Sequence, residues 1–312
     1  MRFGIVGSGQ RPEGMPDPGF FRAFAEQAEE LGYDSLWSTD HLSFENPILE
    51  GVVALSAFAG CTRRIALGTG ILLLPLRHPS LVAKQVASLD YLSGGRVLLG
   101  IGVGGEGARD FAAVQVPVGE RDARADEGIR VLKTLWAGGP ATVDGRFFRF
   151  EDVSIEPGPT QSGGPPVIVG GRSAAALYRA GVIGDGWLAY MASPDRFARE
   201  LAIVRAHAEG SGRSPDALFR GLMLPTHVGS DADRARQHVV GHLSKRYGRP
   251  FEAYQVDRSC LAGSPPELVE RLRAYRAAGV HHVVFNLAGP ADAALAEARL
   301  LAEEVVAPLR SG

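Results

Sequence analysis

The clearest pattern of hydrophobic and polar positions lies between residues 65 and 105. Residues 65–67, 71–74 and 97–101 are apolar at successive positions, which is typical of strands buried on both faces. Thr69-Gly70 interrupts the first of the two predicted strands, at 65–74, where the chain must leave the sheet. Between them, Pro79 begins a segment whose apolar residues recur at steps of three and four, as on one face of a helix, and Gly94 ends it. This stretch therefore predicts a strand, a helix and a second strand, with the two strands parallel.

The same alternation of short apolar runs and helical stripes continues along the chain. Strands are predicted at 2–6, 34–38, 65–74, 97–101, 167–169, 184–189, 218–228 and 283–287. Eight strands that alternate with helices in about 250 core residues are what a closed (β/α)8 barrel requires. We therefore expect an α/β TIM barrel, formed by one domain that spans residues 1–312.

Two segments depart from this alternation and are expected as insertions after strands 4 and 7. In residues 138–165, Asp144-Gly145 joins two short alternating runs, at 141–143 and 146–150, which is typical of a hairpin. Residues 247–263 mix proline, aromatic and charged side chains, so we expect an irregular segment there. Both insertions are expected to shape a substrate pocket, without a motif that names the substrate.

Composition narrows the possible partners. The chain has 45% hydrophobic and 22% charged residues and a formal net charge of −2, which gives no reason to expect nucleic acid or an acidic membrane surface as a partner. No apolar run approaches the roughly 20 residues that span a bilayer. Cys61 and Cys260 are too few for a disulfide framework, and the sequence begins with a predicted strand and no apolar signal segment. We therefore expect a cytoplasmic protein.

Metal and Schiff-base chemistry are both disfavoured. The adjacent His281-His282 would point to opposite sides of a predicted strand, so we interpret the pair as structural and expect no metal site. A sugar-phosphate lyase or isomerase barrel would need a lysine, a metal cluster or a paired acid and base at the strand ends. Lys84, Lys133 and Lys245 all fall on predicted helices, which argues against the lysine route.

Barrel geometry predicts where the chemistry lies, because active sites in this fold gather at the carboxyl ends of the strands. Polar residues and glycines follow or close the predicted strands at Gly7-Ser8, Asp40-His41, Thr69-Gly70, Gly102 to Glu106, Gly170 to Ser173, Tyr190-Met191, His227 and Asn286. We therefore expect a ligand site at this end of the barrel.

Four stretches of the sequence resemble the bacterial-luciferase-like superfamily of flavin- and deazaflavin-dependent oxidoreductases. They are LGYDSLWSTDHL at 31–42, RIALGTGILLLPLRHPSLVAKQVASLDYLSGGRVLLGIGVGG at 64–105, RADEGIRVLKTLW at 124–136 and PPVIVGGRSAAALYRAGVIGDGWL at 165–188. The resemblance covers nearly the whole chain, and the stretches occur in the order of the barrel strands. It implies the same barrel, a flavin or the deazaflavin coenzyme F420 bound at the carboxyl end, and a homodimer.

Within this resemblance, Gly170, Gly171, Arg172 and Ser173 are expected to bind the cofactor phosphate. They place backbone N–H groups at a helix N-terminus, and Arg172 adds positive charge. The alternative is an ordinary glycine turn followed by a serine cap. Gly102 and Gly104 are expected near the cofactor too, because they lack side chains that would block its approach.

His41 resembles the histidine that follows the second strand in this superfamily and lies beside the cofactor ring. Its ordinary pKa near 6.5 makes it the main candidate for a general acid or base, with Asp40 positioned to influence it. The alternative is a histidine satisfied by backbone groups. Glu106 resembles an acidic residue after the fourth strand of some deazaflavin enzymes, but GVGGEG is one residue longer than their pattern, and a solvated loop glutamate is an equal alternative.

The resemblance also implies a non-proline cis peptide bond in Thr69-Gly70-Ile71, against the cofactor ring. We place it at Gly70-Ile71, because Gly70 has no Cβ to clash there. The alternative is a trans glycine bulge. Side chains that could wall an apolar pocket for ring and substrate are Phe44, Trp187, Tyr190, Met191 and Met223.

The resemblance leaves three functions open. The first is hydride transfer between coenzyme F420 and a small organic substrate, which the Asp40-His41 pair and the overall resemblance favour. The second is an FMN-dependent monooxygenase that uses oxygen. The third is a non-catalytic flavin-binding barrel, because a fold does not fix a function.

Overall fold

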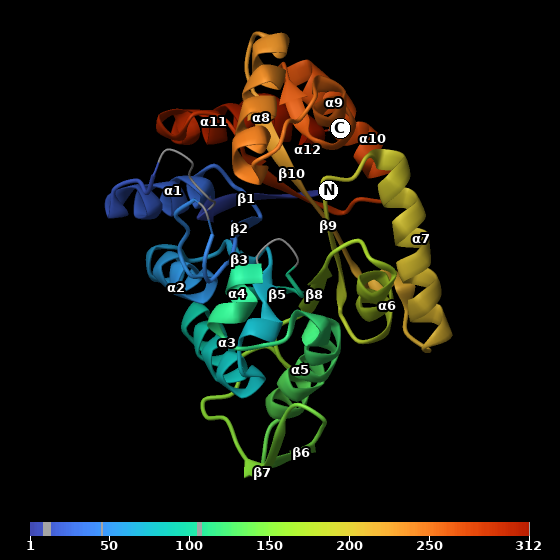
Figure 1. The fold of residues 1–312 in the computed structure, drawn as a ribbon. Helices are drawn as coiled ribbons and strands as arrows, with labels where there is room; N and C mark the ends of the chain where they lie inside the picture. Colours follow the sequence, from blue (N-terminus) through green and yellow to red (C-terminus); the bar gives the residue numbers. More distant parts are fainter. Residues whose placement is uncertain (9–13, 45, 105–107, 312) are drawn as a thin grey trace.

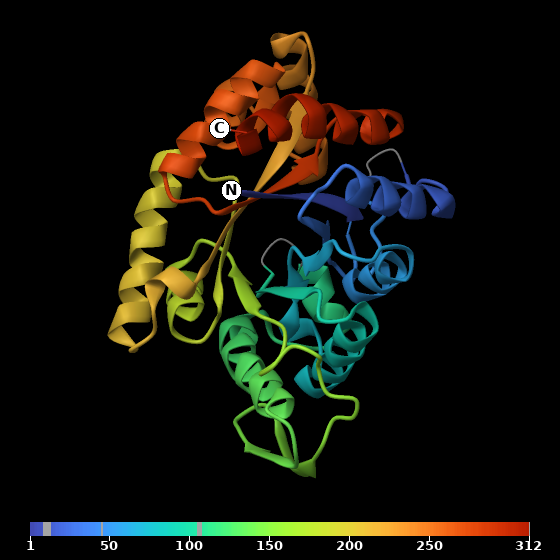
Figure 2. The ribbon, with the colours of Figure 1, turned by 180° about the vertical axis from the view of Figure 1, so that it is seen from behind.

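The computed structural model describes residues 1–8, 14–44, 46–104 and 108–311. Its centre is a closed ring of parallel strands, in the order β1 (Arg2–Ser8), β2 (Ser35–Ser38), β3 (Ala66–Thr69), β5 (Val97–Gly102), β8 (Val167–Gly170), β9 (Gly186–Tyr190), β10 (Phe219–Val228) and β12 (His282–Leu287). The ring closes because β12, from the C-terminal part of the chain, pairs with β1. The predicted α/β TIM barrel is confirmed (Figures 1 and 2).

The helices cover the outside of this ring or lie beside its mouth. They are α1 (Pro18–Glu30), α2 (Gly51–Cys61), α3 (Pro79–Ser93), α4 (Ala108–Ala113), α5 (Arg121–Trp136), α6 (Ala174–Val182), α7 (Pro194–Gly210), α8 (Ala232–Tyr247), α9 (Ala253–Ser259), α10 (Pro265–Ala277), α11 (Ala294–Leu300) and α12 (Ala307–Ser311). A π-helical stretch, Leu301–Val306, joins the last two. Prolines stand in the first turn of several of these helices, where no N–H is needed, and side-chain caps satisfy other first-turn N–H groups.

Two apolar layers hold the barrel together. The larger lies between the strands and the helices, and the smaller fills the inside of the ring, with Trp37, Ile168, Leu188 and Met223 among its members. The inside also contains a polar contact, in which His282 Nε2 lies 2.7 Å from the Ser35 hydroxyl. His282, the first residue of β12, is buried, and His281 just before the strand is exposed, in agreement with the prediction that the two rings point in opposite directions.

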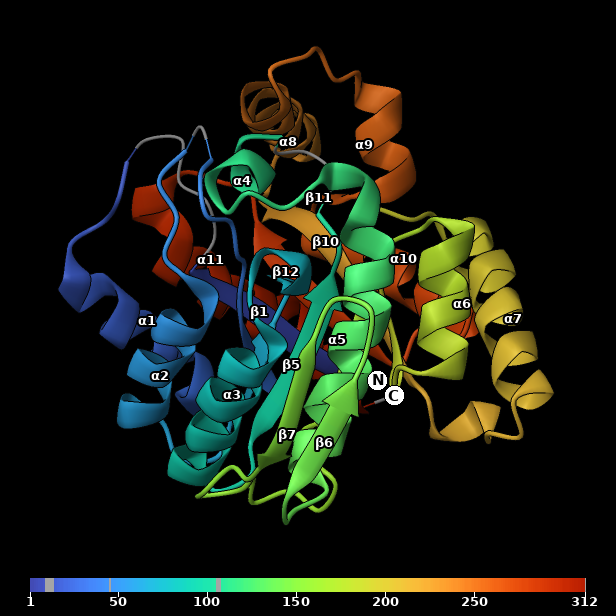
Figure 3. The same cartoon turned by 60° about the horizontal axis from the view of Figure 1, so that its bottom comes forward.

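The structure corrects three details of the expected elements. The strand expected at 65–74 is two strands, β3 and β4 (Leu72–Leu73), with the peptide bond between Gly70 and Ile71 separating them. The hairpin in 138–165 is confirmed, but its second strand, β7 (Arg149–Val153), begins three residues later than expected and pairs with β6 (Ala141–Asp144) (Figure 3).

The expectation that 247–263 is irregular is wrong. This segment contains α9 and a short strand, β11 (Leu261–Gly263), which pairs with the end of β10. A capping box formed by Glu252 and Gln255 begins α9, and Val256 is buried beneath it. The segment is therefore an ordered wall beside the barrel mouth.

Candidate functional site

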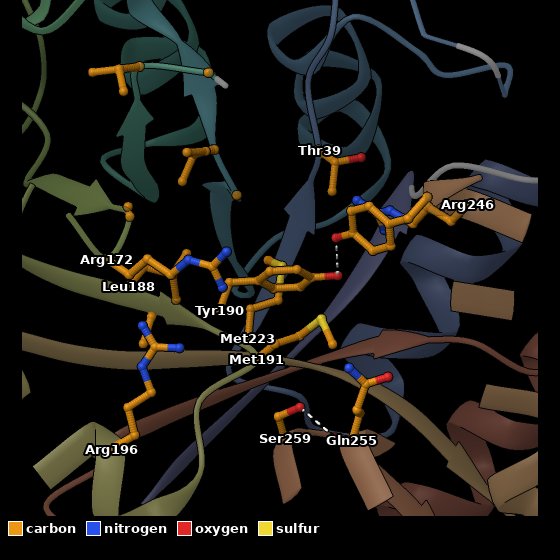
Figure 4. Close-up of a pocket in the computed structure, with 18 of the residues that line it drawn as sticks. Thr39, Arg172, Leu188, Tyr190, Met191, Arg196, Met223, Arg246, Gln255 and Ser259 are labelled. Atoms are coloured by element: carbon orange, nitrogen blue, oxygen red, sulfur yellow. Dashed lines mark hydrogen bonds between the residues drawn. The ribbon is translucent and has the colours of Figure 1, made fainter. Parts of the chain in front are cut away.

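A cavity of about 800 Å³ opens at the carboxyl ends of the strands, where the chemistry is expected. The loops after β2, β3, β5, β8 and β9 and the segment from the end of α8 through α9 line it. Figure 4 shows Tyr190 in the middle of this space, with Arg172 and Arg196 on one side and Gln255 and Ser259 on another. A drug-sized ligand occupies a cavity of this size.

Ile71, Leu188 and Met223 give the cavity an apolar floor. The peptide bond between Gly70 and Ile71 is cis, which confirms the prediction made for this strand end. A Cβ on Gly70 would overlap the terminal methyl group of Met223, so a larger residue here would require the Met223 side chain to move. These residues present the flat apolar surface that a planar ring system needs.

Gly102 lies behind the Ile71 side chain, and its expected place near the cofactor stays a prediction. It does not line the cavity, and a Cβ at this position would overlap the Ile71 side chain. Thr69 is also turned away from the cavity, because its buried hydroxyl donates to the Gly100 carbonyl at 2.7 Å. Gly102 therefore leaves space for the Ile71 side chain that forms part of the cavity floor, and Thr69 links the end of β3 to β5. Gly104 lines the cavity, as expected.

The loop after β8 forms one end of the cavity. Gly170, Gly171 and Arg172 line it, and Gly171 has φ +122°, a conformation that favours glycine. Ser173 caps α6 by accepting a hydrogen bond from the Ala176 N–H at 3.2 Å. Other N–H groups of this first turn have no partner within the helix and stand beside an arginine, which suits an anion such as a phosphate.

Trp187 was expected to line the cavity. It instead contacts the loop after β8 from the core side. Its indole N–H donates to the Gly171 carbonyl at 2.8 Å, and its ring stacks on Phe197 in the core. Tyr190, Met191 and Met223 do line the cavity. Phe44 packs beside His41, with ring centroids 4.4 Å apart.

His41 forms a hydrogen-bonded pair with a residue that the sequence did not indicate. Its Nδ1 lies 2.9 Å from Asp110 Oδ2, and Asp110 Oδ1 accepts a 2.6 Å hydrogen bond from the Ser43 N–H. The Asp110 side chain is 1% exposed and that of His41 12% exposed. Since Asp110 occupies Nδ1, Nε2 is the ring nitrogen that remains for a ligand in the cavity.

Asp40 lines the cavity next to His41, but its carboxylate is directed at Arg77. The two side chains form a bidentate ion pair at 2.8 Å for each bond, and the Leu73 N–H donates to the same carboxylate at 3.1 Å. Arg77 also bonds Glu50 at 3.0 Å. Asp40 therefore ties the loop after β2 to the chain after β4, and its influence on His41 stays a prediction. Glu106 lies outside the described residues.

The outer wall combines tyrosines and arginines. The Tyr190 and Tyr247 hydroxyls are 3.3 Å apart, and the Arg246 guanidinium lies 5.4 Å from the centre of the Tyr247 ring. In the ranges that the structure describes, no group of three or more histidine, cysteine, aspartate or glutamate side chains could hold a metal ion. No described helix is both long and apolar enough to cross a membrane.

The residues around this cavity fit a planar cofactor that carries a phosphate. The floor is apolar and free of side chains at Gly70, and the first turn of α6 with Arg172 offers an anion site at one end. His41 supplies a titratable ring at the same cavity. These features support binding of a flavin or a deazaflavin.

Comparison with known proteins places these observations in a family. A sequence model of the luciferase-like monooxygenase family matches residues 1–282. An F420-dependent glucose-6-phosphate dehydrogenase of Beutenbergia cavernae is 32% identical over 316 residues, with 93% of each chain covered. An F420-dependent hydroxymycolic acid dehydrogenase of Mycobacterium tuberculosis is 33% identical over 221 residues, covering 69% of this chain and 60% of that protein.

Solved structures agree with this assignment. The monooxygenase RslO1 of Streptomyces bottropensis superposes with a TM-score of 0.85 at 26% identity, covering 99% of this chain and 100% of that one. An F420-dependent secondary alcohol dehydrogenase, solved with an F420-acetone adduct, shares the fold with a TM-score of 0.84 at 19% identity and 98% coverage of both chains. The chain belongs to the luciferase-like monooxygenase family.

Proposed function

We propose that this chain is an oxidoreductase that binds coenzyme F420 non-covalently and transfers a hydride between it and a small organic substrate. The observation that carries the proposal is that one cavity joins an anion site at the N-terminus of α6, an apolar floor and the His41–Asp110 pair. Two relatives that cover 93% and 69% of this chain are named as F420-dependent dehydrogenases, which favours the deazaflavin over other cofactors.

Different residues would bind the phosphate and the ring of the cofactor. Gly170, Gly171, Arg172 and the first turn of α6 would hold the phosphate, with Ser173 fixing the start of that helix. Ile71 and Met223 would support the ring on the floor. When bound, the deazaflavin supplies or accepts a hydride at its ring carbon.

His41 would handle the proton that accompanies this transfer. Asp110 fixes the orientation of the ring, so that Nε2 would take a proton from a substrate hydroxyl or return one to a carbonyl oxygen. The Tyr190 hydroxyl lines the same cavity and would bind the substrate oxygen or the cofactor edge. Gly104 leaves room for the ring between these groups.

An FMN-dependent monooxygenase is the second candidate function. It is favoured by the match to RslO1, a monooxygenase that is 26% identical and covers nearly the whole chain. The anion site at α6 would bind the phosphate of FMN in the same way. A non-catalytic flavin-binding barrel would use the cavity for binding alone.

A homodimer is also part of the proposal. α2 carries no charged residue on any face, yet Val53 is 66% exposed, and beside it on α3 Leu81 and Leu92 are 65% and 75% exposed. A helix that is apolar all round belongs in an interior, and α2 and α3 pack side by side. A second copy of this chain would cover this face. The cytoplasmic location and the single domain over 1–312 stay predictions.

A turnover experiment tests the proposed function. The protein is loaded with oxidised F420 without oxygen and mixed with a panel of primary and secondary alcohols, and reduction of the deazaflavin is followed by its absorbance. The proposal expects reduction with at least one alcohol. FMN-dependent consumption of oxygen with an organic substrate, in place of deazaflavin reduction, would establish the second candidate. Binding of either cofactor, with neither deazaflavin reduction by the alcohols nor oxygen consumption with FMN and organic substrates, would favour the non-catalytic flavin-binding barrel.

A further inference from the structure

A second cavity, of about 180 Å³, lies at the amino ends of the strands, at the opposite end of the barrel from the cofactor site. It is too small for a drug-sized ligand, which needs about 300 Å³ or more, but it has room for one phosphate or sulfate group. The start of the chain, the start of β10, the last turn of α10 and the turn before β12 line it: Met1, Arg220, Arg276, Gly279, Val280 and His281. None of these six residues is acidic.

Two of the lining residues, Arg220 and His281, are neighbours on the outer face of the sheet. The register of β10 and β12 pairs Gly221 with His282, so the residues just before them stand side by side. The His281 N–H also donates to the Arg220 carbonyl at 2.9 Å. Because His282 points into the barrel, toward the Ser35 hydroxyl, strand alternation turns the Arg220 and His281 side chains outward together.

The arginines of this cavity carry positive charge that no carboxylate balances. The Nε of Arg220 is buried and has no hydrogen-bond partner. Arg276 donates to the Leu309 carbonyl at 2.6 Å, which is a neutral acceptor. Within the ranges that the structure describes, neither arginine forms an ion pair.

Two carboxylates that precede strands at this end of the barrel already have cationic partners. Asp34, just before β2, lies 2.7 Å from an Arg310 nitrogen. Asp185, just before β9, bonds Lys133 at 2.9 Å and Arg213 at 3.1 Å. Neither carboxylate is therefore available to Arg220.

The ring of His281 reports this excess of positive charge. Burial lowers its pKa below the ordinary value, and the charges of Arg220, of the Met1 amino group and of Arg2 lower it further. An anion among these groups would offset the repulsion and raise the pKa of His281 again.

We propose that Arg220 and Arg276 bind one tetrahedral inorganic oxyanion, of the phosphate or sulfate class, in the small cavity at the amino end of the barrel. Guanidinium groups bind such an anion through charge-assisted hydrogen bonds. The anion would link β10 to α10 and to the turn before β12, at the end of the barrel that contributes to stability and not to catalysis. The inference goes beyond the proposed function and does not depend on it.

Titration with sulfate, followed by nuclear magnetic resonance of the histidine rings, tests this site. Sulfate is the probe because its charge does not change near neutral pH, and it replaces chloride at constant ionic strength. The His281 signal, assigned from the spectrum of His281→Gln, should shift saturably at millimolar sulfate, and the pKa of His281 should rise. A shift that grows without saturation up to molar sulfate would overturn the inference.

Variants distinguish the proposed site from a general effect of salt. Arg220→Gln and Arg276→Gln should each weaken sulfate binding by about tenfold or more. Arg199→Gln removes the same charge from α7, outside this cavity, and should bind sulfate as the wild type does. A thermal melt in chloride shows whether each variant is folded, and Arg276→Gln, at an exposed position, serves if Arg220→Gln is not. Wild-type sulfate affinity in a folded variant of either arginine would overturn the inference.

Discussion

One hydrogen bond, between His41 Nδ1 and Asp110 Oδ2, determines which ring nitrogen of His41 the cavity can use. We predict that His41→Ala keeps F420 binding and loses turnover by about 10²-fold or more, because the proton-transfer group is gone. Asp110→Asn should lower kcat less than His41→Ala does, because the amide keeps a hydrogen bond to the ring but favours the other tautomer of His41. His281→Ala, at the opposite end of the barrel, serves as the control. Unchanged turnover of His41→Ala on a verified substrate would remove His41 from the mechanism.

A second residue-scale prediction concerns pH and His282. Burial inside the barrel lowers the pKa of His282 to about 4, so the folded state holds the ring neutral where the unfolded chain, with a pKa near 6.5, takes up a proton. The stabilisation is complete above pH 6.5 and is lost as the pH falls toward 4, by up to about 3 kcal/mol.

Urea unfolding at pH 7.5 and pH 5 measures this loss, because most carboxylates stay ionised over that interval. His282→Gln, which keeps a polar group near the Ser35 hydroxyl, should be less stable at pH 7.5 and should lose much less stability on acidification than the wild type. An equal loss in both proteins would show that His282 is not the group that titrates.

At the scale of single elements, the N-terminus of α6 is the proposed binding site for the cofactor phosphate. Gly171→Val should weaken F420 binding, because φ +122° strains a residue with a Cβ and the added side chain would crowd Ala176. Arg172→Glu should weaken it more at low salt than at high salt, because the ligand is an anion. Arg199→Glu makes the same charge change on α7 outside the cavity and should bind normally. Wild-type affinity in the first two variants would place the phosphate elsewhere.

Helices and strands whose apolar residues repeat at a regular spacing could be predicted from the sequence. Contacts between side chains far apart in the sequence could not. The strand, helix and strand of 65–105 and the Gly170 to Ser173 turn follow from local patterns that the structure reproduces. The contact of His41 with Asp110 joins residues 69 positions apart and leaves no local signal. α9 is seven residues long, too short for a visible period, although the Glu252 and Gln255 of its capping box were a usable start signal.

At the scale of the whole molecule, the proposed dimer has a direct test in sedimentation analysis. Val53→Glu/Leu81→Glu places two charges on the exposed apolar face of α2 and α3 and should convert a dimer to a monomer, since burying them without partners is unfavourable. Ile203→Glu, an equivalent change on α7, should leave the dimer intact. A wild-type monomer at micromolar concentration would contradict the proposal.

The central claim is that the cavity at the carboxyl end of the barrel is an F420 site whose phosphate lies at α6. Fluorescence titration of the purified protein with F420 and with FMN, repeated with Arg172→Glu, tests it most directly. The account predicts saturable binding of F420, tighter than that of FMN, and a clear loss of F420 affinity in the variant at low salt. Tighter binding of FMN, or F420 binding that Arg172→Glu leaves unchanged, would contradict it.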